Sequence, residues 1–513
     1  MTHRIFRNPS ALILCIATVA HAAERPNIVV FLVDDMGLMD TSVPFLADQT
    51  GTPERHPLNE FYRTPGMERL AATGTRFETF YAMSVCSPTR VSLLTGQNAA
   101  RHHTTQWIKS ESNNRGAAGP PDWGWLGIEA GDVTLPALLD DAGYRTLFVG
   151  KAHFGPDDVF GELPQNFGFD VNIAGCSYGS PGSYLGMENF AKNRRRAVPG
   201  LAKYHGEDIF LTEALTREMN AEISAAVAAG EPFFAYMGHY AVHGPFTADE
   251  RFAEGYATRR GEGKFATMIA GIDKSLGDML DHLDDLGVAE DTLVFFLGDN
   301  GTDAPLGGFH EIACSAPLRG KKGTHYEGGT RVPFIASWAK PRAGDETQAA
   351  LPLEAGALRR QAGNVTDLFP TIARLAGVDI PAGHVVDGAD LSGRLAGVDD
   401  VPTRFLMHFP HRHRTSYFTS YREEDWKVVY HYFPADGGDV GVALDFEPAF
   451  PRYELYDLAT DPTESRNLAD SDPARLHAMM TKLAAALEGH GAQYPVAAGR
   501  ELRPIVPATP AGL

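Results

Sequence analysis

Several continuous runs of apolar, often β-branched residues predict strands that are buried on both faces. Such runs do not alternate between apolar and polar positions, which is typical of a parallel sheet covered by helices on both sides. Amphipathic segments of helical spacing separate them. The predicted strands lie at residues 27–33, 144–149, 232–237, 292–297 and 334–338, and the predicted helices at about 65–74, 135–142, 208–229 and 264–286. Between the first two of these strands we also predict a short strand through residues 77–81, a helix that begins at about 91 and a long loop over 96–131. The pattern predicts an α/β architecture with a large, mostly parallel sheet flanked by helices.

The pattern changes after about residue 398. Short strand-like segments separated by turns follow, and then residues 473–488 have the apolar spacing of an amphipathic helix. The short segments are 405–409, 417–421, 426–432 and 454–458. We therefore predict a main α/β domain over 25–397 and a smaller C-terminal subdomain over 398–500, built from an antiparallel sheet and a helix.

The amino terminus has the pattern of an export signal. Arg4 and Arg7 precede an apolar stretch over 11–20, and Ala20-His21-Ala22 offers small residues for cleavage. Cys15 lies inside that stretch, but Leu14 before it argues against lipoprotein processing. We expect residues 1–22 to be a signal peptide and the protein to be periplasmic or secreted. Elsewhere no run approaches the ~20 apolar residues of a membrane span, so none is predicted.

The charge of the chain restricts its partners. It has 513 residues, with 45 Lys and Arg against 65 Asp and Glu, a formal charge of −20. Residues 1–22 hold two basic and no acidic residues, so the remainder carries −22. Such an acidic body argues against nucleic acid as a partner, and an anionic substrate would need a local cluster of cations. An oxidising compartment would permit a disulfide between Cys176 and Cys314, but the sequence does not place them within bonding distance.

Polar residues follow three of the predicted strands. Asp34-Asp35 follows the first, Lys151 and His153 follow the second, and Asp299-Asn300 follows the fourth. Open α/β sheets bind ligands at the carboxyl ends of their strands. A single aspartate there often only caps the next helix, but two adjacent carboxylates repel each other unless a cation lies between them. We therefore favour a site for a hard divalent cation.

The stretch Cys86-Ser87-Pro88-Thr89-Arg90, with Leu93-Leu94-Thr95-Gly96 behind it, forms an ordered set with these residues. The set continues in His243-Gly244-Pro245 and in Gly320-Lys321-Lys322-Gly323-Thr324. In this order the motifs resemble the type I sulfatases of the alkaline phosphatase superfamily. The resemblance implies an alkaline-phosphatase-like fold and hydrolysis of sulfate esters. It also implies that a maturation enzyme oxidises Cys86 to formylglycine, which serves as the nucleophile.

The resemblance further implies a role for each motif residue. Lys151 and Lys322 would hold the sulfate, and Lys321 is the alternative to Lys322. His243 would bind the ester and protonate the leaving alcohol. His153 and Arg90 would hold the hydrated aldehyde. His239 is interpreted as structural. The resemblance also implies a cation, which would be bound by Asp34, Asp35, Asp299, Asn300 and an oxygen on the modified Cys86. We favour Ca²⁺ over Mg²⁺ because the site is rich in carboxylates. The family has Trp where this chain has Ala152.

Two alternatives remain open at this stage. The same nucleophile and cation would serve a formylglycine-dependent phosphonate monoester or phosphodiester hydrolase, and the protein could also be a non-catalytic binder of sulfated glycans. For the sulfatase we expect a sulfated carbohydrate as substrate. We interpret Arg194-Arg195-Arg196 as solvated surface, residues 408–414 as the rim of the pocket or an exposed turn, and Trp107, Trp123 and Trp125 as packing or sugar-stacking residues.

Overall fold

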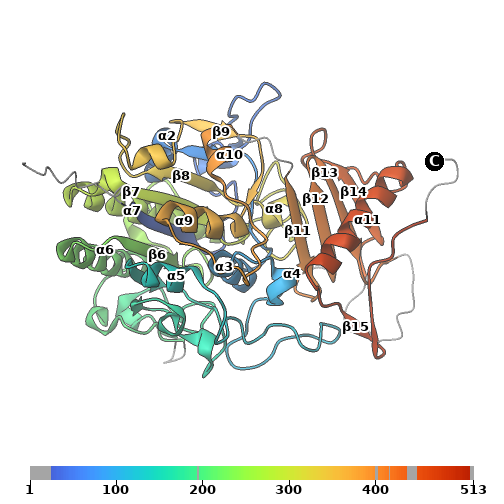
Figure 1. Ribbon diagram of the computed structural model, residues 1–513, viewed down its shortest axis with the longest axis horizontal. Helices are drawn as coiled ribbons and strands as arrows, with labels where there is room; N and C mark the ends of the chain where they lie inside the picture. Colours follow the sequence, from blue (N-terminus) through green and yellow to red (C-terminus); the bar gives the residue numbers. More distant parts are fainter. Residues whose placement is uncertain (1–24, 193–195, 399–402, 415, 436–447, 509–513) are drawn as a thin grey trace, which may run out of the picture.

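A mixed sheet forms the centre of the larger unit (Figure 1). The computed structural model describes residues 25–192, 196–398, 403–414, 416–435 and 448–508. In this part of the chain the sheet has eight strands in the order β5-β4-β6-β1-β7-β8-β2-β9. Their bounds are Val171–Ile173 for β5, Arg145–Gly150 for β4, Phe233–His239 for β6, Asn27–Val33 for β1, Thr292–Gly298 for β7, Phe334–Trp338 for β8, Thr75–Phe77 for β2 and Ala357–Arg359 for β9.

The middle of the sheet is parallel. β4, β6, β1 and β7 run in one direction, with Val33 beside both His239 and Gly298. β8 runs antiparallel to its neighbours β7 and β2. This mixed sheet with a parallel centre confirms the predicted fold class, and it brings the carboxyl ends of β1, β4, β6 and β7 to one edge.

Helices cover both faces of the sheet. Alternate residues of β1 enter two separate cores: Val29, Phe31 and Val33 pack with one set of helices, whereas Ile28, Val30 and Leu32 pack with another. The first set is α2 (Pro65–Thr73), α6 (Leu211–Ala229) and α7 (Gly261–Asp285); the second is α3 (Cys86–Thr95), α5 (Leu135–Asp141) and α9 (Leu368–Ala376). Burial of both faces explains why β1 is a continuous apolar run.

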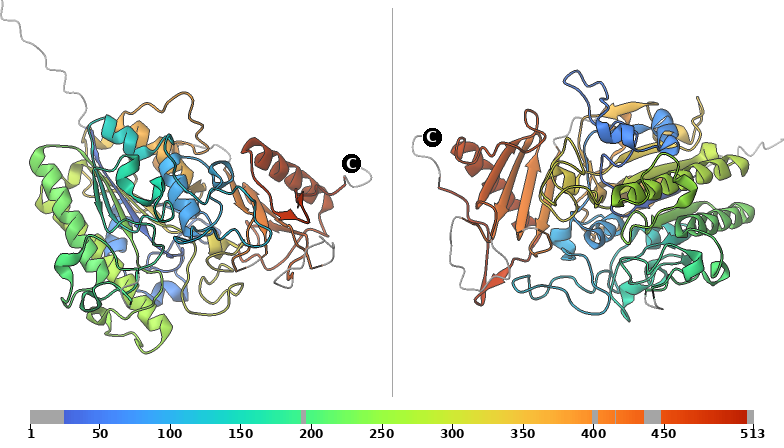
Figure 2. Two further views of the ribbon diagram at one scale, coloured as in Figure 1. Left: turned by 90° about the horizontal axis from the view of Figure 1, so that it is seen from below. Right: turned by 180° about the vertical axis from the view of Figure 1, so that it is seen from behind.

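The C-terminal unit lies at one end of the molecule, as the orange and red elements of Figures 1 and 2 show. It is an antiparallel sheet of four strands, with α11 (Pro473–Gly489) packed against it. The strands are β11 (Arg404–Phe409), β12 (Phe418–Glu423), β13 (Trp426–His431) and β14 (Tyr453–Asp457). The antiparallel sheet with one helix is as predicted. The boundaries at 25, 397, 398 and 500 stay predictions.

Short elements complete the fold. They are α1 (Pro57–Phe61), β3 (Phe80–Tyr81), α4 (Ala99–His102), α8 (Glu327–Thr330), β10 (Gly363–Asn364), α10 (Ser392–Ala396), β15 (Val496–Ala497) and β16 (Arg500–Glu501). The single strand expected after α2 is in fact two, because β2 joins the large sheet whereas β3 pairs with β10. The region 96–131, expected to be all loop, contains α4.

Three further expectations concern the chain as a whole. The signal peptide expected over 1–22 lies outside the described residues. Cys176 and Cys314 are both buried free thiols, so the disulfide that the sequence left open is not formed. Among the helices of the described residues, none combines the length and the apolar character needed to cross a membrane.

Candidate active site

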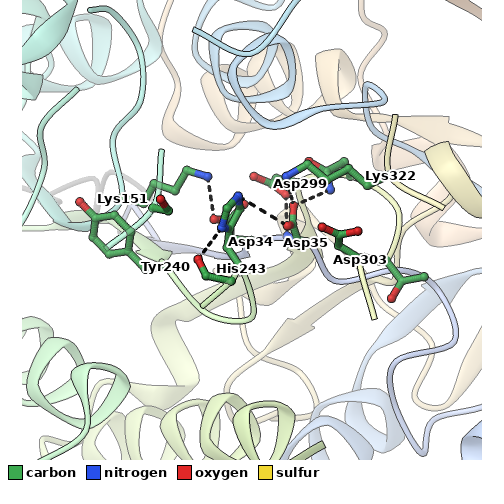
Figure 3. Close-up of polar contacts among 12 residues, drawn as sticks. Asp34, Asp35, Lys151, Tyr240, His243, Asp299, Asp303 and Lys322 are labelled. Atoms are coloured by element: carbon green, nitrogen blue, oxygen red, sulfur yellow. Dashed lines mark hydrogen bonds and ion pairs between the residues drawn. The ribbon is translucent and has the colours of Figure 1, made fainter. Parts of the chain in front are cut away.

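The parallel strands place the predicted residues together at their carboxyl edge. Asp34 and Asp35 follow β1, Asp299 and Asn300 follow β7, and Lys151 follows β4. The close approach of β4 and β6 requires Gly150, whose added Cβ would lie 1.8 Å from the carbonyl oxygen of Gly238. Figure 3 shows how the carboxylates and ammonium groups point toward one another.

Cys86 lies at the start of α3, beside these carboxylates. The sequence predicted a helix only from Val91, but it begins at Cys86. Pro88 is tolerated in this first turn because backbone N–H groups there have no partner within the helix. The ligand atoms of Cys86, Asp34 and Asp299 all lie within 4.8 Å of one another. Burial raises the pKa of the Cys86 thiol, and Lys151 and Lys322 offset this only in part. The thiol is therefore protonated, and it is not an activated thiolate.

Each of the two lysines forms an ion pair with one of the adjacent aspartates. Lys151 Nζ donates to Asp34 Oδ2 at 2.6 Å, and Lys322 Nζ donates to Asp35 Oδ1 at 2.5 Å. Burial alone would raise the pKa of Asp35, but Lys322, with smaller contributions from His243 and Lys151, holds it far below its ordinary value. Lys321 instead donates to the backbone oxygens of Ala304 and Gly307. The geometry thus favours Lys322 over Lys321 as the site lysine.

Arg90 fixes the third carboxylate. Its Nε and Nη2 atoms donate to Asp299 Oδ2 at 3.0 and 2.9 Å, and its Nη1 atom donates to the backbone oxygen of Lys151 at 2.7 Å. Asp299 Oδ1 in turn accepts the backbone N–H of Asp35. Arg90 therefore joins the ends of β4 and β7, a positioning role that its place in the sequence motif did not indicate. Burial, with the nearby Asp34 charge, raises the pKa of Asp299 to about 6.

The oxygen atoms left over fit a hard cation. Asp34 Oδ1, Asp35 Oδ2 and Asn300 Oδ1 are buried, and no hydrogen-bond donor among the described residues reaches them. The Asn300 side chain is oriented by its own amide, which donates to Asp35 Oδ1 at 2.9 Å and leaves the oxygen free. Unpartnered buried oxygens are rare in proteins. With the nearby Asp299, they form the all-oxygen donor set that Ca²⁺ and Mg²⁺ prefer.

Two histidines complete the surroundings of Cys86. His153 donates from Nε2 to the Ile108 carbonyl oxygen at 2.5 Å, which leaves its buried Nδ1 as a free acceptor. His243 donates from Nδ1 to the Gly244 carbonyl oxygen, and its Nε2 lies 3.8 Å from Asp35 Oδ2. Burial lowers the pKa of His243 to about 4, so the ring is neutral near pH 7. His239, by contrast, is bonded to Ser275 and buried, as expected for a structural histidine.

A cavity of about 240 Å³ opens onto this cluster. Cys86, His153, His243 and Lys322 are among the residues that line it. Sequence reasoning missed another lining residue, Asp303, whose only signal was its position three residues after Asn300. Trp107 also lines the cavity, whereas Trp123 packs against His411 in the C-terminal unit.

The tract 408–414 is neither simply a rim nor an exposed turn. His408 and His411 are buried, whereas His413 and Arg414 line the cavity. Arg194 and Arg195 lie outside the described residues. Arg196 is exposed, as expected for solvated surface, but it also lines the cavity.

Comparison with known proteins identifies related chains. The chain is 34% identical over 385 residues to mouse N-acetylgalactosamine-6-sulfatase, covering 72% of this chain and 66% of that protein. It is 29% identical over 503 residues to human arylsulfatase A, and the match covers 90% of this chain and 86% of that protein. The solved structure of Ps i-CgsB with k-i-k-neocarrahexaose has a TM-score of 0.67 at 22% sequence identity, and the match covers 90% of this chain and 93% of that one. The model of the Sulfatase family matches residues 26–378, and the chain therefore belongs to the sulfatase family.

Proposed function

We propose that the protein is an exported sulfatase that hydrolyses sulfate esters of carbohydrates, with formylglycine made from Cys86 as its nucleophile. The observation that carries the proposal is the convergence of two ammonium groups and three unpartnered oxygens on a buried, protonated Cys86. A thiol in that state is a poor nucleophile, whereas an oxidised and hydrated side chain offers hydroxyl groups. The name of the mouse relative, N-acetylgalactosamine-6-sulfatase, supports a sulfated sugar as substrate.

The cation belongs to the same proposal. Asp34, Asp35, Asp299 and Asn300 would hold Ca²⁺, with Mg²⁺ as the less favoured ion, and residue 86 would add an oxygen. A divalent cation there supplies positive charge beside the attacking oxygen and lowers the pKa of a hydroxyl. The ion pairs with Lys151 and Lys322 hold two of these carboxylates in place without it.

The chain's own residues account for the chemistry of sulfate transfer. One hydroxyl of the hydrated aldehyde attacks sulfur, and the bond between sulfur and the ester oxygen breaks. Lys151 and Lys322 neutralise charge on the sulfate oxygens. The arriving anion raises the pKa of His243, whose Nε2 then carries the proton that the departing alcohol receives. The free Nδ1 of His153 accepts a hydrogen bond from the hydrated side chain.

The second hydroxyl completes the cycle. It loses its proton, the bond between carbon and the sulfate oxygen breaks, and sulfate leaves as the aldehyde re-forms. Addition of water restores the diol, so each turnover consumes one water molecule and releases one alcohol and one sulfate. A serine at position 86 lacks the second hydroxyl and would stay trapped as its sulfate ester. Maturation of Cys86 by a formylglycine-generating enzyme and location in the periplasm or outside the cell are parts of the proposal.

Side-by-side kinetics test this function. The mature protein should hydrolyse nitrophenyl sulfate in preference to a nitrophenyl phosphonate ester, and Cys86→Ala should abolish that activity while the fold remains intact. A preference for the phosphonate would favour the phosphonate monoester or phosphodiester hydrolase. Binding of sulfated glycan without sulfate release would favour a non-catalytic binder. Undiminished turnover by Cys86→Ala would exclude the proposed nucleophile.

A further inference from the structure

Most charged groups in the cavity wall are already compensated. Asp303 and Arg414 form an ion pair with each other, with Nη2 2.8 Å from Oδ2, and Lys322 is paired with Asp35. Burial lowers the pKa of His413 to about 3, so this ring is neutral. These groups therefore add little net charge toward a ligand beyond the sulfate position.

Two cations in the same wall remain uncompensated. Lys109 and Arg196 line the cavity, and no carboxylate of a described residue lies within ion-pair distance of either. The chain as a whole carries a formal charge of −20, so two unpaired cations beside one cavity differ in sign from the protein around them. A ligand with a second negative charge would find its counter-charge here.

Both cations are held in place by neutral contacts. Arg196 Nη1 donates to the Oγ atom of the buried Ser180 at 2.8 Å, which leaves the remaining N–H groups of the guanidinium available. Lys109 is fixed through its backbone: its N–H donates to Asn114 Oδ1 at 3.0 Å, and its carbonyl oxygen accepts from Trp125 Nε1 at 3.1 Å. Both residues are thus anchored, while the Lys109 ammonium and the remaining N–H groups of the Arg196 guanidinium are available to bind an anion.

We propose that Lys109 and Arg196 form a second anion subsite, so that the preferred substrate carries another anionic group besides the sulfate ester that is cleaved. This inference rests on the proposed sulfatase function. The cavity of about 240 Å³ lies below the ~300–1,000 Å³ usual for ligand pockets. A second anion must therefore lie close to the ester, on the same sugar ring or on the adjoining one. A second sulfate and a uronate carboxylate share the chemistry that this pair of cations would recognise.

Three matched substrates test the subsite. They are a galactosamine 6-sulfate, the corresponding 4,6-disulfate, and a 6-sulfated disaccharide with a neighbouring uronate. We expect kcat/KM for 6-sulfate release to be ~10-fold or more higher with a second anion, mainly through a lower KM, as charge-assisted hydrogen bonds predict. A higher kcat/KM for the disulfate would show that the subsite binds a second sulfate, and a higher kcat/KM for the uronate disaccharide would show that it binds a carboxylate.

Charge-removing variants locate the effect. Lys109→Gln and Arg196→Gln should each reduce the ratio of kcat/KM between the dianionic and monoanionic substrates, whereas Lys109→Arg should retain it. Lys192→Gln removes an exposed charge that does not line the cavity, and should leave the ratio unchanged. A ratio near one in the wild type, or one that the two glutamine variants do not alter, overturns the subsite while sulfatase activity stands. Absence of turnover on every sulfate ester, nitrophenyl sulfate included, overturns the proposed function itself.

Discussion

Lys322 donates a hydrogen bond of 2.5 Å to Asp35, a residue 287 positions earlier in the chain. The contact brings the loop after β7 to the end of β1, and it is one of two such pairs, the other being Lys151 with Asp34. Both pairs lie beside Cys86, whose thiol they are close enough to influence. The site is therefore assembled by the sheet, because its parts come from strands that are distant in sequence.

The neighbouring lysines 321 and 322 allow a matched comparison. Lys322→Met should lower kcat by about 10²–10³-fold, the usual effect of removing one donor to a developing anion. Lys321→Met removes hydrogen bonds to the carbonyl oxygens of Ala304 and Gly307, outside the ion-pair cluster, and should mainly affect stability. Steady-state kinetics with a sulfate ester, together with melting curves, distinguish the two effects. Equal losses of kcat in both variants would contradict the assignment of Lys322.

Removal of divalent cations should destabilise the folded protein. Without an ion, the free oxygens of Asp34, Asp35 and Asn300 stay buried and unpartnered, and a bound ion at 100 times its Kd would add about 2.7 kcal/mol to the free energy of unfolding. We expect the Tm to fall on dialysis against a chelator and to recover more with Ca²⁺ than with Mg²⁺. Asn300→Leu should reduce the recovery. A Tm that responds neither to the chelator nor to added ions would argue against a cation site.

A buried ion cluster links the two units of the fold. Lys427 of β13 donates to Glu327 of α8 at 2.9 Å and to Glu464 at 2.7 Å, and all three side chains are buried. Lys427→Met would leave the buried Glu464 without its cation, whereas Glu327 would keep Arg331 at 3.1 Å, and the change should lower the free energy of unfolding by about 3–5 kcal/mol. Chemical denaturation measures this change.

The matched control is Lys340→Met. Lys340 is paired with Asp284 at 2.8 Å, but both side chains are about half exposed. Solvent screens such pairs, so their loss changes stability little. If Lys427→Met and Lys340→Met lowered the free energy of unfolding equally, the buried ion cluster would not stabilise the contact between the two units.

Asp40 should make stability depend on pH. Burial raises the pKa of this carboxyl to about 7, although Thr302, Gly37 and Tyr62 offer it hydrogen bonds. A raised pKa in the folded state means that the neutral acid is favoured on folding. The contribution of the neutral Asp40 carboxyl to the free energy of unfolding is fully present below the unfolded pKa of 3.8, and it is lost as the pH rises through about 7. Between about pH 5 and pH 8, wild type should lose stability relative to Asp40→Asn. Chemical denaturation at both pH values measures the difference in the free energy of unfolding between the two proteins. A difference that is the same at pH 5 and pH 8 would contradict this prediction.

The sequence predicted the parts of the fold that burial controls. β1 and β7 appear as continuous apolar runs because both faces of each strand are covered, and the polar residues at their ends follow from strand direction. The start of α3 was missed because Pro88 obscures the helical pattern of its first turn. The contact of Arg90 with Asp299 could not be predicted, since it depends on how a helix packs over a strand 209 positions later. Similarly, three consecutive arginines gave no sign that Arg196 reaches the cavity.

The chemical identity of residue 86 determines the proposed mechanism, and the mass of one peptide tests it. Trypsin cleaves after Arg76 and Arg90 and releases the peptide 77–90, which contains Cys86. In protein produced together with a formylglycine-generating enzyme, we expect this peptide to have the mass of an aldehyde in place of the CH₂SH group and to react with a hydrazine. An active preparation in which the peptide carries only unmodified cysteine would exclude formylglycine as the nucleophile.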